Sequence, residues 1–350
     1  MKESVDDLTF DPDFTRAHQY FRGQVAYKPS PLREALHPGG SPLWLKDETS
    51  RMGLGAFKAL GGPYAVARLI MEAWKSETGE DITPSRLKDA DLRAFASRQS
   101  FVCASAGNHG LGVAAGAKEL GAKARIYLAK TVPAGFDDRL KERGAEVVRA
   151  GETYDDSVAE AIADAERTGA TLLADGTWQG YTEIPKLVME GYTVIAEELR
   201  AEFEASGVWP THVYLQAGVG GLAAAMAHMI RKNWSIQPEL IVVEPEAALC
   251  LKASHDAGRP VRAEGPDSNM GRLDCKEPSI VAWQTLERCN VRYANLSEEE
   301  GELAAEAVTG LGLATTPSGA AGYGALCKDV ETGRLDADAR SLVIVSEGPA

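Results

Sequence analysis

Residues 101–129 read FVCASAGNHGLGVAAGAKELGAKARIYLA, and this stretch changes periodicity twice. Its two ends, Phe101–Ala104 and Ala124–Ala129, are rich in apolar and β-branched residues and predict strands. The segment Gly110–Leu120 between them predicts a helix, which ends at Gly121 as helices often do. A strand, a helix and a second strand in this order predict a βαβ unit and therefore a parallel sheet.

The same alternation extends in both directions from this unit. Glu146–Arg149 and Thr171–Ala174 predict further strands, and Ala134–Arg143 and Tyr154–Arg167 predict the helices between them. Ser297 with Glu300 predicts a capping box. A second series of strands and helices is predicted at His212–Leu215, Leu222–Lys232, Leu240–Val243, Val291–Tyr293, Glu298–Leu311, Gly319–Val330 and Ser341–Val345.

The chain is therefore predicted to be an α/β protein with two lobes, each built on a largely parallel sheet flanked by helices. The smaller lobe, residues 96–179, is expected to be inserted into a larger lobe formed by residues 1–95 and 180–350. The functional site is expected in the crevice between the lobes, at the carboxyl ends of strands. Residues 77–97 predict a polar surface connection with little regular structure, and Gly258–Asp274 predicts a long loop that borders the site.

Composition excludes several classes of function. The 350 residues carry a net charge of −14, which argues against a nucleic acid or an anionic membrane as partner. No apolar run reaches membrane-spanning length, and the N-terminus lacks the apolar region of a signal peptide, so a cytoplasmic location is expected. Five cysteines without Cys-x-x-Cys spacing predict reduced thiols and no zinc site. Glu244, His255 and Asp267 have no metal-ligand spacing, so no metal site is expected.

One lysine lies in an unusual context, the segment Gly55–Gly62. Lys58 follows the extended run Pro42–Asp47, precedes the apolar helical run Tyr64–Ala73, and is flanked by small residues and glycines. Glycines allow a bulky cofactor to approach closely, and a lysine amine that has lost its proton attacks carbonyl groups. A lone lysine of this kind is more often an ordinary surface residue, so the other motifs decide between the two interpretations.

A glycine-rich loop, Gly218-Val219-Gly220-Gly221-Leu222, follows the strand that begins at His212 and precedes an alanine-rich helix. Free backbone N–H groups and the positive end of the helix dipole make such a loop a binding site for an anion, and phosphate suits it. Neither the Walker spacing nor the dinucleotide spacing is present. A tight turn that binds nothing is an equally good interpretation of this loop alone.

Two more segments carry polar side chains at the start of a predicted helix, and the first of them follows a predicted strand. Ser105-Ala106-Gly107-Asn108-His109 offers a hydroxyl, an amide and backbone N–H groups that suit a substrate carboxylate. The alternative is a capped helix with Asn108 as the cap and His109 as a structural hydrogen-bonding residue. In Thr316–Ala320, Ser318 has the equally simple alternative of an ordinary N-cap.

Taken in order, Lys58 and the three loops resemble the fold-type-II pyridoxal-phosphate enzymes, the tryptophan-synthase-β family of dehydratases and their relatives. The resemblance runs from about Phe14 to Ser346, and the sequences of the motifs are most similar to those of the diaminopropionate ammonia-lyase branch. It rests on the glycine loop and on the stretches Lys46–Lys58, Asp175–Pro185 and Gln216–Gly220. It implies a homodimer, a small amino-acid substrate and pyridoxal 5'-phosphate as cofactor.

The resemblance also implies roles for single residues. Lys58 would hold the cofactor covalently and then act as the base on the substrate α-carbon. Asn108 would meet the pyridoxal oxygen, and Ser318 would face the pyridine nitrogen. The phosphate would lie on Gly218, Val219, Gly220, Gly221 and Leu222, and the substrate carboxylate would lie near Ser105, Ala106, Asn108 and His109.

A neutral hydroxyl at Ser318 leaves the pyridine ring a weaker electron sink than an aspartate would, which disfavours transamination and favours β-elimination. The implied reaction converts 2,3-diaminopropionate to pyruvate and ammonia. Asp175 and Tyr154 match polar positions near the substrate in the ammonia-lyase branch and are candidates for holding the departing amine. Their alternatives are a strand-end carboxylate and a helix-start tyrosine.

Ala106 departs from the pattern, because ammonia-lyases that accept both enantiomers carry an aspartate at this place. A methyl group accepts no proton, so selectivity for the L-enantiomer is expected. Other interpretations are an L-serine, L-threonine or hydroxyaspartate dehydratase, a β-replacement synthase, and a homologue that binds the cofactor without turnover.

Overall fold

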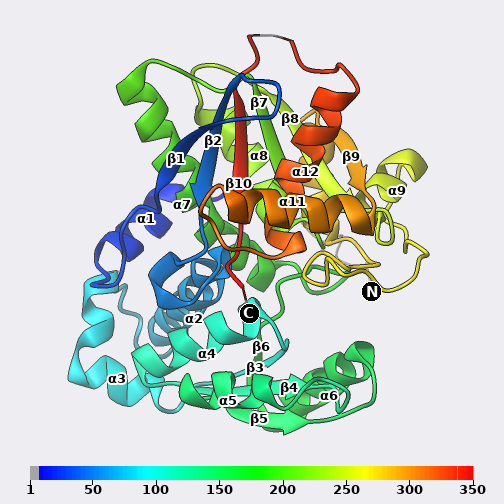
Figure 1. Ribbon diagram of the computed structural model, residues 1–350. Coiled ribbons are helices and arrows are strands. Elements are labelled where there is room, and N and C mark those ends of the chain that lie inside the picture. The colour runs from blue at the N-terminus through cyan, green and yellow to red at the C-terminus, as the bar shows by residue number, and fades with distance from the viewer. Residues whose placement is uncertain (1–7, 337, 350) are drawn as a thin grey trace.

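The computed structural model describes residues 8–336 and 338–349, and it contains two separate sheets (Figure 1). The large sheet has the strand order β1-β2-β10-β7-β8-β9, in which only β1 pairs antiparallel to its neighbour. The small sheet has the order β5-β4-β3-β6 and is parallel throughout. The strands are β1 (Leu32–Leu36), β2 (Pro42–Asp47), β3 (Ser100–Ala104), β4 (Lys123–Leu128), β5 (Glu146–Arg149), β6 (Thr171–Leu172), β7 (His212–Gln216), β8 (Glu239–Pro245), β9 (Arg292–Leu296) and β10 (Ser341–Val345).

Helices cover both faces of the sheets (Figure 1), and short 3-10 turns precede two of the helices, α2 and α3. The α-helices are α1 (Phe14–Arg22), α2 (Gly61–Thr78), α3 (Ala90–Ala96), α4 (Asn108–Leu120), α5 (Gly135–Glu142), α6 (Tyr154–Thr168), α7 (Glu183–Ser206), α8 (Gly221–Asn233), α9 (Cys250–Ala257), α10 (Ile280–Arg288), α11 (Glu298–Gly310) and α12 (Pro317–Glu331). The 3-10 turns are η1 (Arg51–Gly53), η2 (Phe57–Ala59) and η3 (Pro84–Lys88).

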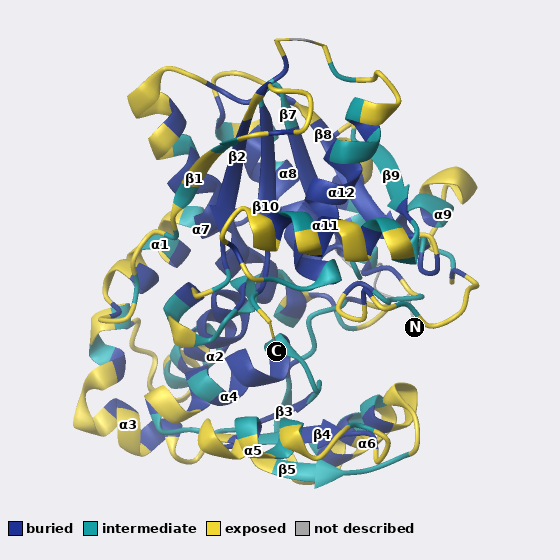
Figure 2. Ribbon diagram, viewed as in Figure 1, coloured by how far each residue is buried: buried dark blue, intermediate teal, exposed yellow. Residues whose placement is uncertain are grey.

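The strands of the large sheet are apolar on both faces, and alternate residues pack against different helices. Val213 and Leu215 of β7 belong to the hydrophobic cluster that includes α7 and α8, whereas Tyr214 belongs to the cluster that includes α11 and α12. Such near-continuous apolar strands are typical of parallel sheets covered on both sides. Figure 2 shows β10, β7 and β8 as buried along almost their whole length.

The small sheet divides its residues in the same way. Phe101 and Cys103 of β3 pack in the cluster that contains α4, and Val102 packs with Ala161 of α6 on the other face. The predicted α/β fold with two mainly parallel sheets, and with the βαβ unit of residues 101–129 inside the smaller one, is confirmed. The capping box of Ser297 and Glu300 is present at the start of α11.

Residues 77–97 were expected to have little regular structure, and that expectation is wrong. This segment forms η3 and α3, and its apolar side chains Leu87, Leu92 and Phe95 are buried. A few well-spaced apolar residues among many charges are enough to anchor a 3-10 turn and a short amphipathic helix. The long loop Gly258–Asp274 contains no helix or strand, as predicted.

The longest helix, α7, was not predicted from the sequence pattern. Its buried face carries Glu190, Glu197 and Glu198 among apolar residues, so the helical period of hydrophobicity is interrupted. Basic side chains offset the charge of a buried carboxylate; Glu198, for example, accepts hydrogen bonds from Lys46 and Arg51.

Within residues 8–336 and 338–349, no helix is long and apolar enough to cross a membrane. The five cysteines are free thiols.

Candidate active site

Four loops that follow strands meet between the large sheet and the small sheet. They follow β2, β3, β7 and β10, and they carry Lys58, Asn108, the Gly218–Leu222 loop and Glu347. Parallel pairing of β10 with β2 and with β7 brings three of these strand ends to the same edge of the large sheet. The fold therefore gathers polar groups at carboxyl ends of strands, where α/β proteins bind ligands.

Backbone contacts on two sides hold the Lys58 segment. The N–H of Phe57 donates to the carbonyl of Ser346 at 3.0 Å, and the N–H of Gly348 donates to the carbonyl of Gly55 at 2.9 Å. On the other side, a Cβ at Gly112 of α4 would lie only 2.8 Å from the Lys58 carbonyl oxygen. Glycine at that place allows α4 to pack directly against the lysine segment.

The ammonium group of Lys58 forms an ion pair with the carboxylate of Asp175, which lies in the loop after β6. The two side chains are 22% and 23% exposed. Burial lowers the pKa of Lys58, but the neighbouring carboxylate outweighs burial and raises that pKa above its ordinary value. Burial likewise raises the pKa of Asp175, whereas Lys58 and then His109 lower it, and the net pKa is below the ordinary value. Both groups are therefore charged near neutral pH.

Two tyrosines lie near this ion pair. Tyr192 is buried in α7, and burial raises the pKa of its hydroxyl to about 12 although Lys58 opposes the shift. Tyr154 is the first residue of α6 and is 61% exposed. Its hydroxyl group is nevertheless surrounded by protein. Burial of that hydroxyl, and then the charge of Asp175, raise its pKa. Both phenols are neutral proton donors at neutral pH.

The glycine loop has the shape that an anion needs. Gly220 has a φ of +101° and precedes α8, and no side chain of the described residues caps the first turn of that helix. A Cβ at Gly218 would lie 2.9 Å from Sγ of Cys275, so a side chain at Gly218 would collide with it. Because no side chain of the described residues caps α8, the backbone N–H groups of its first turn and the positive end of its dipole suit a phosphate group.

Asn108 is not the helix cap that the sequence allowed as an alternative. It is the first residue of α4, and the capping position is Gly107. The Asn108 side chain donates from Nδ2 to Oε2 of Glu347, which follows β10. The asparagine therefore points toward the large sheet, where Lys58 and the glycine loop lie.

Ser318 is also not a helix cap. The cap of α12 is Thr316, whose hydroxyl accepts from the N–H of Gly319. Ser318 is 2% exposed, and its Oγ accepts from the backbone N–H of Arg272 at 3.1 Å. That contact brings the long loop Gly258–Asp274 to the site, in agreement with its prediction as a bordering loop.

The segment Ser105–His109 is called the asparagine loop below. Its residues other than Asn108 differ in their polar groups and in their burial. Ser105 is half-buried, and its Oγ accepts from the N–H of Gly107 at 3.2 Å. Ala106 is half-buried and carries only a methyl group. The His109 ring is 3% exposed and bonds through Nε2 to the Leu173 carbonyl at 2.9 Å, which is a structural contact. Burial lowers the pKa of this imidazole.

These residues fit pyridoxal phosphate. The lysine amine suits the aldehyde of the cofactor. The glycine-rich loop, which has no room for a side chain at Gly218, suits its phosphate, and the Ser318 hydroxyl suits a pyridine nitrogen.

No group of three metal-ligating side chains gathers anywhere in residues 8–336 and 338–349. Glu244 accepts from the backbone N–H groups of Leu251 and Lys252, and His255 contacts Glu287.

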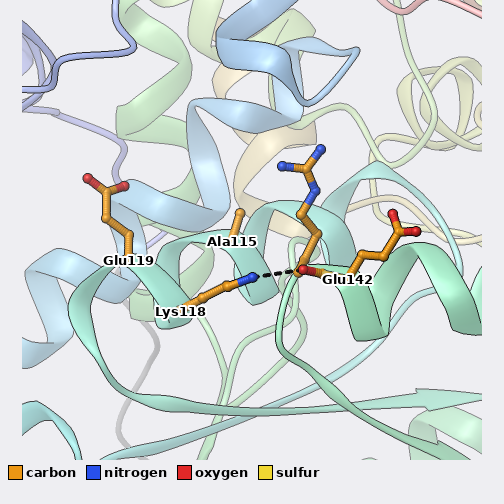
Figure 3. A pocket seen from close by; sticks show the side chains of 5 residues that line it. Ala115, Lys118, Glu119 and Glu142 are labelled. Atoms are coloured by element: carbon orange, nitrogen blue, oxygen red, sulfur yellow. Dashed lines mark hydrogen bonds between the residues drawn. The ribbon is translucent and has the colours of Figure 1, made fainter.

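A separate pocket of about 520 Å³, open to solvent, lies away from these loops (Figure 3). It is lined by Ala115, Lys118, Glu119, Glu142 and Arg143, which come from α4 and from the end of α5. Lys118 donates across it to the Glu142 carbonyl at 2.8 Å. None of these lining residues belongs to the site loops.

Sequence reasoning missed four residues of the site: Tyr192, Arg272, Cys275 and Glu347. One signal was available for Glu347, because it follows a buried strand in the same way as the other site loops do. Arg272 and Cys275 lie in or just after a long irregular loop, where no period marks a position. Tyr192 lies in the helix whose pattern the buried glutamates interrupt.

Comparison with known proteins gives consistent results. A sequence model of the family described as "Pyridoxal-phosphate dependent enzyme" matches residues 24–347. The chain is 34% identical to diaminopropionate ammonia-lyase of Escherichia coli strain K12, over 95% of this chain and 87% of that protein. It superposes on the crystal structure of holo diaminopropionate ammonia lyase from Escherichia coli with a TM-score of 0.85 and 30% identity, over 99% and 91% of the two chains. It also resembles the crystal structure of a threonine deaminase from T.th., with a TM-score of 0.75 and 26% identity over 97% and 99%.

Proposed function

Because this chain belongs to the family of pyridoxal-phosphate-dependent enzymes and is a lyase within it, we propose that it eliminates ammonia from 2,3-diaminopropionate and yields pyruvate. The observation that carries the proposal is the pairing of Lys58 with Asp175 beside the glycine loop. A carboxylate at this place suits a substrate that bears a second amine. The similarity to diaminopropionate ammonia-lyases, over 95% of this chain, supports the same substrate.

The bound cofactor supplies an electron sink that makes the α-hydrogen of an amino acid acidic. Lys58 would hold the cofactor through its aldehyde group, and Nζ of Lys58 would take the proton from the α-carbon of the substrate. The glycine loop would bind the phosphate through backbone N–H groups, and Asn108 would hold the ring hydroxyl oxygen. The N–H groups of the asparagine loop and the Ser105 hydroxyl bind the substrate carboxylate.

Asp175 and Tyr154 act on the other end of the substrate. The Asp175 carboxylate accepts a hydrogen bond from the β-ammonium group and keeps that nitrogen protonated, so that it departs as neutral ammonia. Tyr154 orients the same group from α6. Ser318 remains a neutral partner of the ring nitrogen, which favours elimination over transamination.

The enantiomer is set by Ala106. Abstraction from the face opposite Lys58 requires a second base, and the methyl group of Ala106 supplies none. The enzyme therefore acts on the L-enantiomer and poorly on the D-enantiomer.

Residues 96–179 form the substrate-side lobe in this proposal. The active form is a homodimer, and light scattering on the purified protein tests this oligomeric state.

A panel of amino acids tests the proposed function directly. Release of pyruvate and ammonia from L-diaminopropionate, with little from the D-enantiomer, is the expected result. The similarity to a threonine deaminase structure makes a dehydratase the second candidate, and formation of 2-oxobutyrate from threonine would favour it. Equal turnover of both enantiomers would contradict the selectivity, and a yellow protein inactive on the whole panel would contradict the activity.

A further inference from the structure

Glu347 connects three segments of the active site although none of the recognised motifs contains it. It is 5% exposed and follows β10. Its backbone forms a bridge with Ala56, two residues before Lys58. Its side chain accepts from Thr316 Oγ1 at 2.6 Å through Oε1 and from Asn108 Nδ2 through Oε2. The lysine segment, the asparagine loop and the start of α12 are therefore joined at one carboxylate.

Arg272 provides the countercharge. Its Nε lies 3.6 Å from Oε2 of Glu347, and its backbone N–H donates to Ser318 Oγ. The guanidinium group also lies along Gly107, where an added Cβ would be 3.7 Å from Nε. A carboxylate that is nearly excluded from solvent needs such a partner and several hydrogen bonds to remain charged.

The carboxylate determines which way the Asn108 amide faces. An ionised carboxylate accepts hydrogen bonds and donates none, so only the NH2 group of the asparagine is able to face Oε2. The second hydrogen of that NH2 group is then available to another acceptor. A glutamine at position 347 would accept and donate equally well, and the amide of Asn108 would be free to turn over.

We propose that Glu347 is a positioning residue that fixes the amide of Asn108, so that its NH2 group donates to the ring hydroxyl oxygen of the bound cofactor, with Arg272 balancing the charge. The inference requires that the protein binds pyridoxal phosphate and that Asn108 lies beside its ring hydroxyl group. It does not depend on which amino acid is the substrate. The affinity for the cofactor reports on it without any turnover.

The test is a double-mutant cycle with Glu347→Gln, Asn108→Ala and the combined variant. Apoprotein is titrated with pyridoxal phosphate, protein fluorescence gives the Kd, and the visible spectrum of the bound cofactor is recorded. Glu347→Gln is expected to weaken binding by about tenfold or more and to change the ratio of the absorption bands. In the Asn108→Ala background the same substitution is expected to have little further effect, because Glu347 acts through Asn108.

A matched control separates this role from a general loss of packing. Asp329→Asn also removes a buried carboxylate, which pairs with Tyr214 and Arg292. This variant is expected to lose thermal stability while its cofactor affinity and spectrum stay unchanged. The proposal is overturned if Glu347→Gln leaves both readouts unchanged, if it acts equally in both backgrounds, or if Asp329→Asn weakens cofactor binding as much.

Discussion

Lys58 and Asp175 form an ion pair although 117 positions separate them in the sequence. The lysine follows a strand of the large sheet, and the aspartate follows a strand of the small one. Neither residue is conspicuous alone, since lone lysines and strand-end carboxylates are common. Their pairing beside the glycine-rich loop, in which a Cβ at Gly218 would collide with Cys275, is what turns a sequence resemblance into a defined site.

The charge of Asp175 controls how readily Lys58 loses its proton. Asp175→Asn removes the largest influence that raises the pKa of the amine, while burial still lowers it, so that pKa is expected to fall. Attack on the cofactor aldehyde requires the unprotonated amine, and the pH dependence of cofactor uptake by apoprotein should therefore move to lower pH. Stopped-flow absorbance across a pH series measures this shift, and an unchanged profile would contradict it.

Lys58→Ala should abolish the covalent attachment of the cofactor. Lyase activity is expected to fall by about a thousandfold or more, because both the attachment and the base are lost. Borohydride treatment followed by peptide mass analysis should find a pyridoxyl group on Lys58 in the unaltered enzyme and none in the variant. A modified lysine elsewhere in the unaltered enzyme would refute the assignment.

Ala106→Asp should restore a base on the face opposite Lys58. Turnover of D-diaminopropionate is expected to rise by about a hundredfold, the low end of the gain from a positioned base. Ala106→Asn has the same shape without the base and serves as the control, so it should show no gain. Separate assays of pyruvate release from each enantiomer measure the effect, and equal gains in both variants would argue against proton abstraction at this place.

Close packing of α2 on α4 depends on Gly62. A Cβ there would lie 2.7 Å from the backbone nitrogen of Val113, and backbone moves less easily than a flexible side chain. Gly62→Ala is expected to lower the free energy of unfolding by about 1 to 3 kcal/mol. Gly135→Ala, with no atom within 4 Å of the added Cβ, should be neutral or stabilise by up to about 1 kcal/mol. Urea denaturation of both variants compares them.

The buried carboxylate of Glu198 makes stability depend on pH. It pairs with Lys46 at 2.6 Å and with Arg51 at 2.8 Å. Burial raises its pKa, but the hydrogen bonds from Arg51 and the charges of both partners outweigh burial and lower it. A lowered folded-state pKa means that the stabilisation is complete above the ordinary value of 4.5 and is lost as the pH falls through the folded-state pKa.

Glu198→Gln should therefore destabilise the protein by about 3 to 5 kcal/mol at neutral pH, because the buried Lys46 loses its carboxylate partner and the buried Arg51 keeps only Glu48. The difference from the unaltered protein should shrink in acid. Glu204→Gln removes a carboxylate that is 44% exposed and pairs with Arg200, and it should change stability by less than about 0.5 kcal/mol. Denaturation curves at several pH values test both statements, and a pH-independent difference for Glu198→Gln would count against the linkage.

Much of this protein follows from its sequence. The strand-and-helix alternation determined two mainly parallel sheets, because the period of two in strands and of 3.6 in helices is a local property of the chain. Lys58, the glycine loop and the Asn108 loop were recognisable for a similar reason, since close approach and anion binding need particular residues at short spacing. The resemblance to pyridoxal-phosphate enzymes added Asp175 and Tyr154 to the candidates and assigned Ser318 to the pyridine nitrogen.

Only the tertiary structure decided the partners of these residues. Helix capping was the simpler local interpretation of Asn108 and Ser318, but the cap positions belong to Gly107 and Thr316. Asn108 and Ser318 instead contact Glu347 and Arg272 from distant segments. The pairing of Lys58 with Asp175 likewise depends on how two sheets face each other. Hydrogen bonds and ion pairs between distant segments leave no periodic signal in a sequence, because they depend on where the fold brings the chain together.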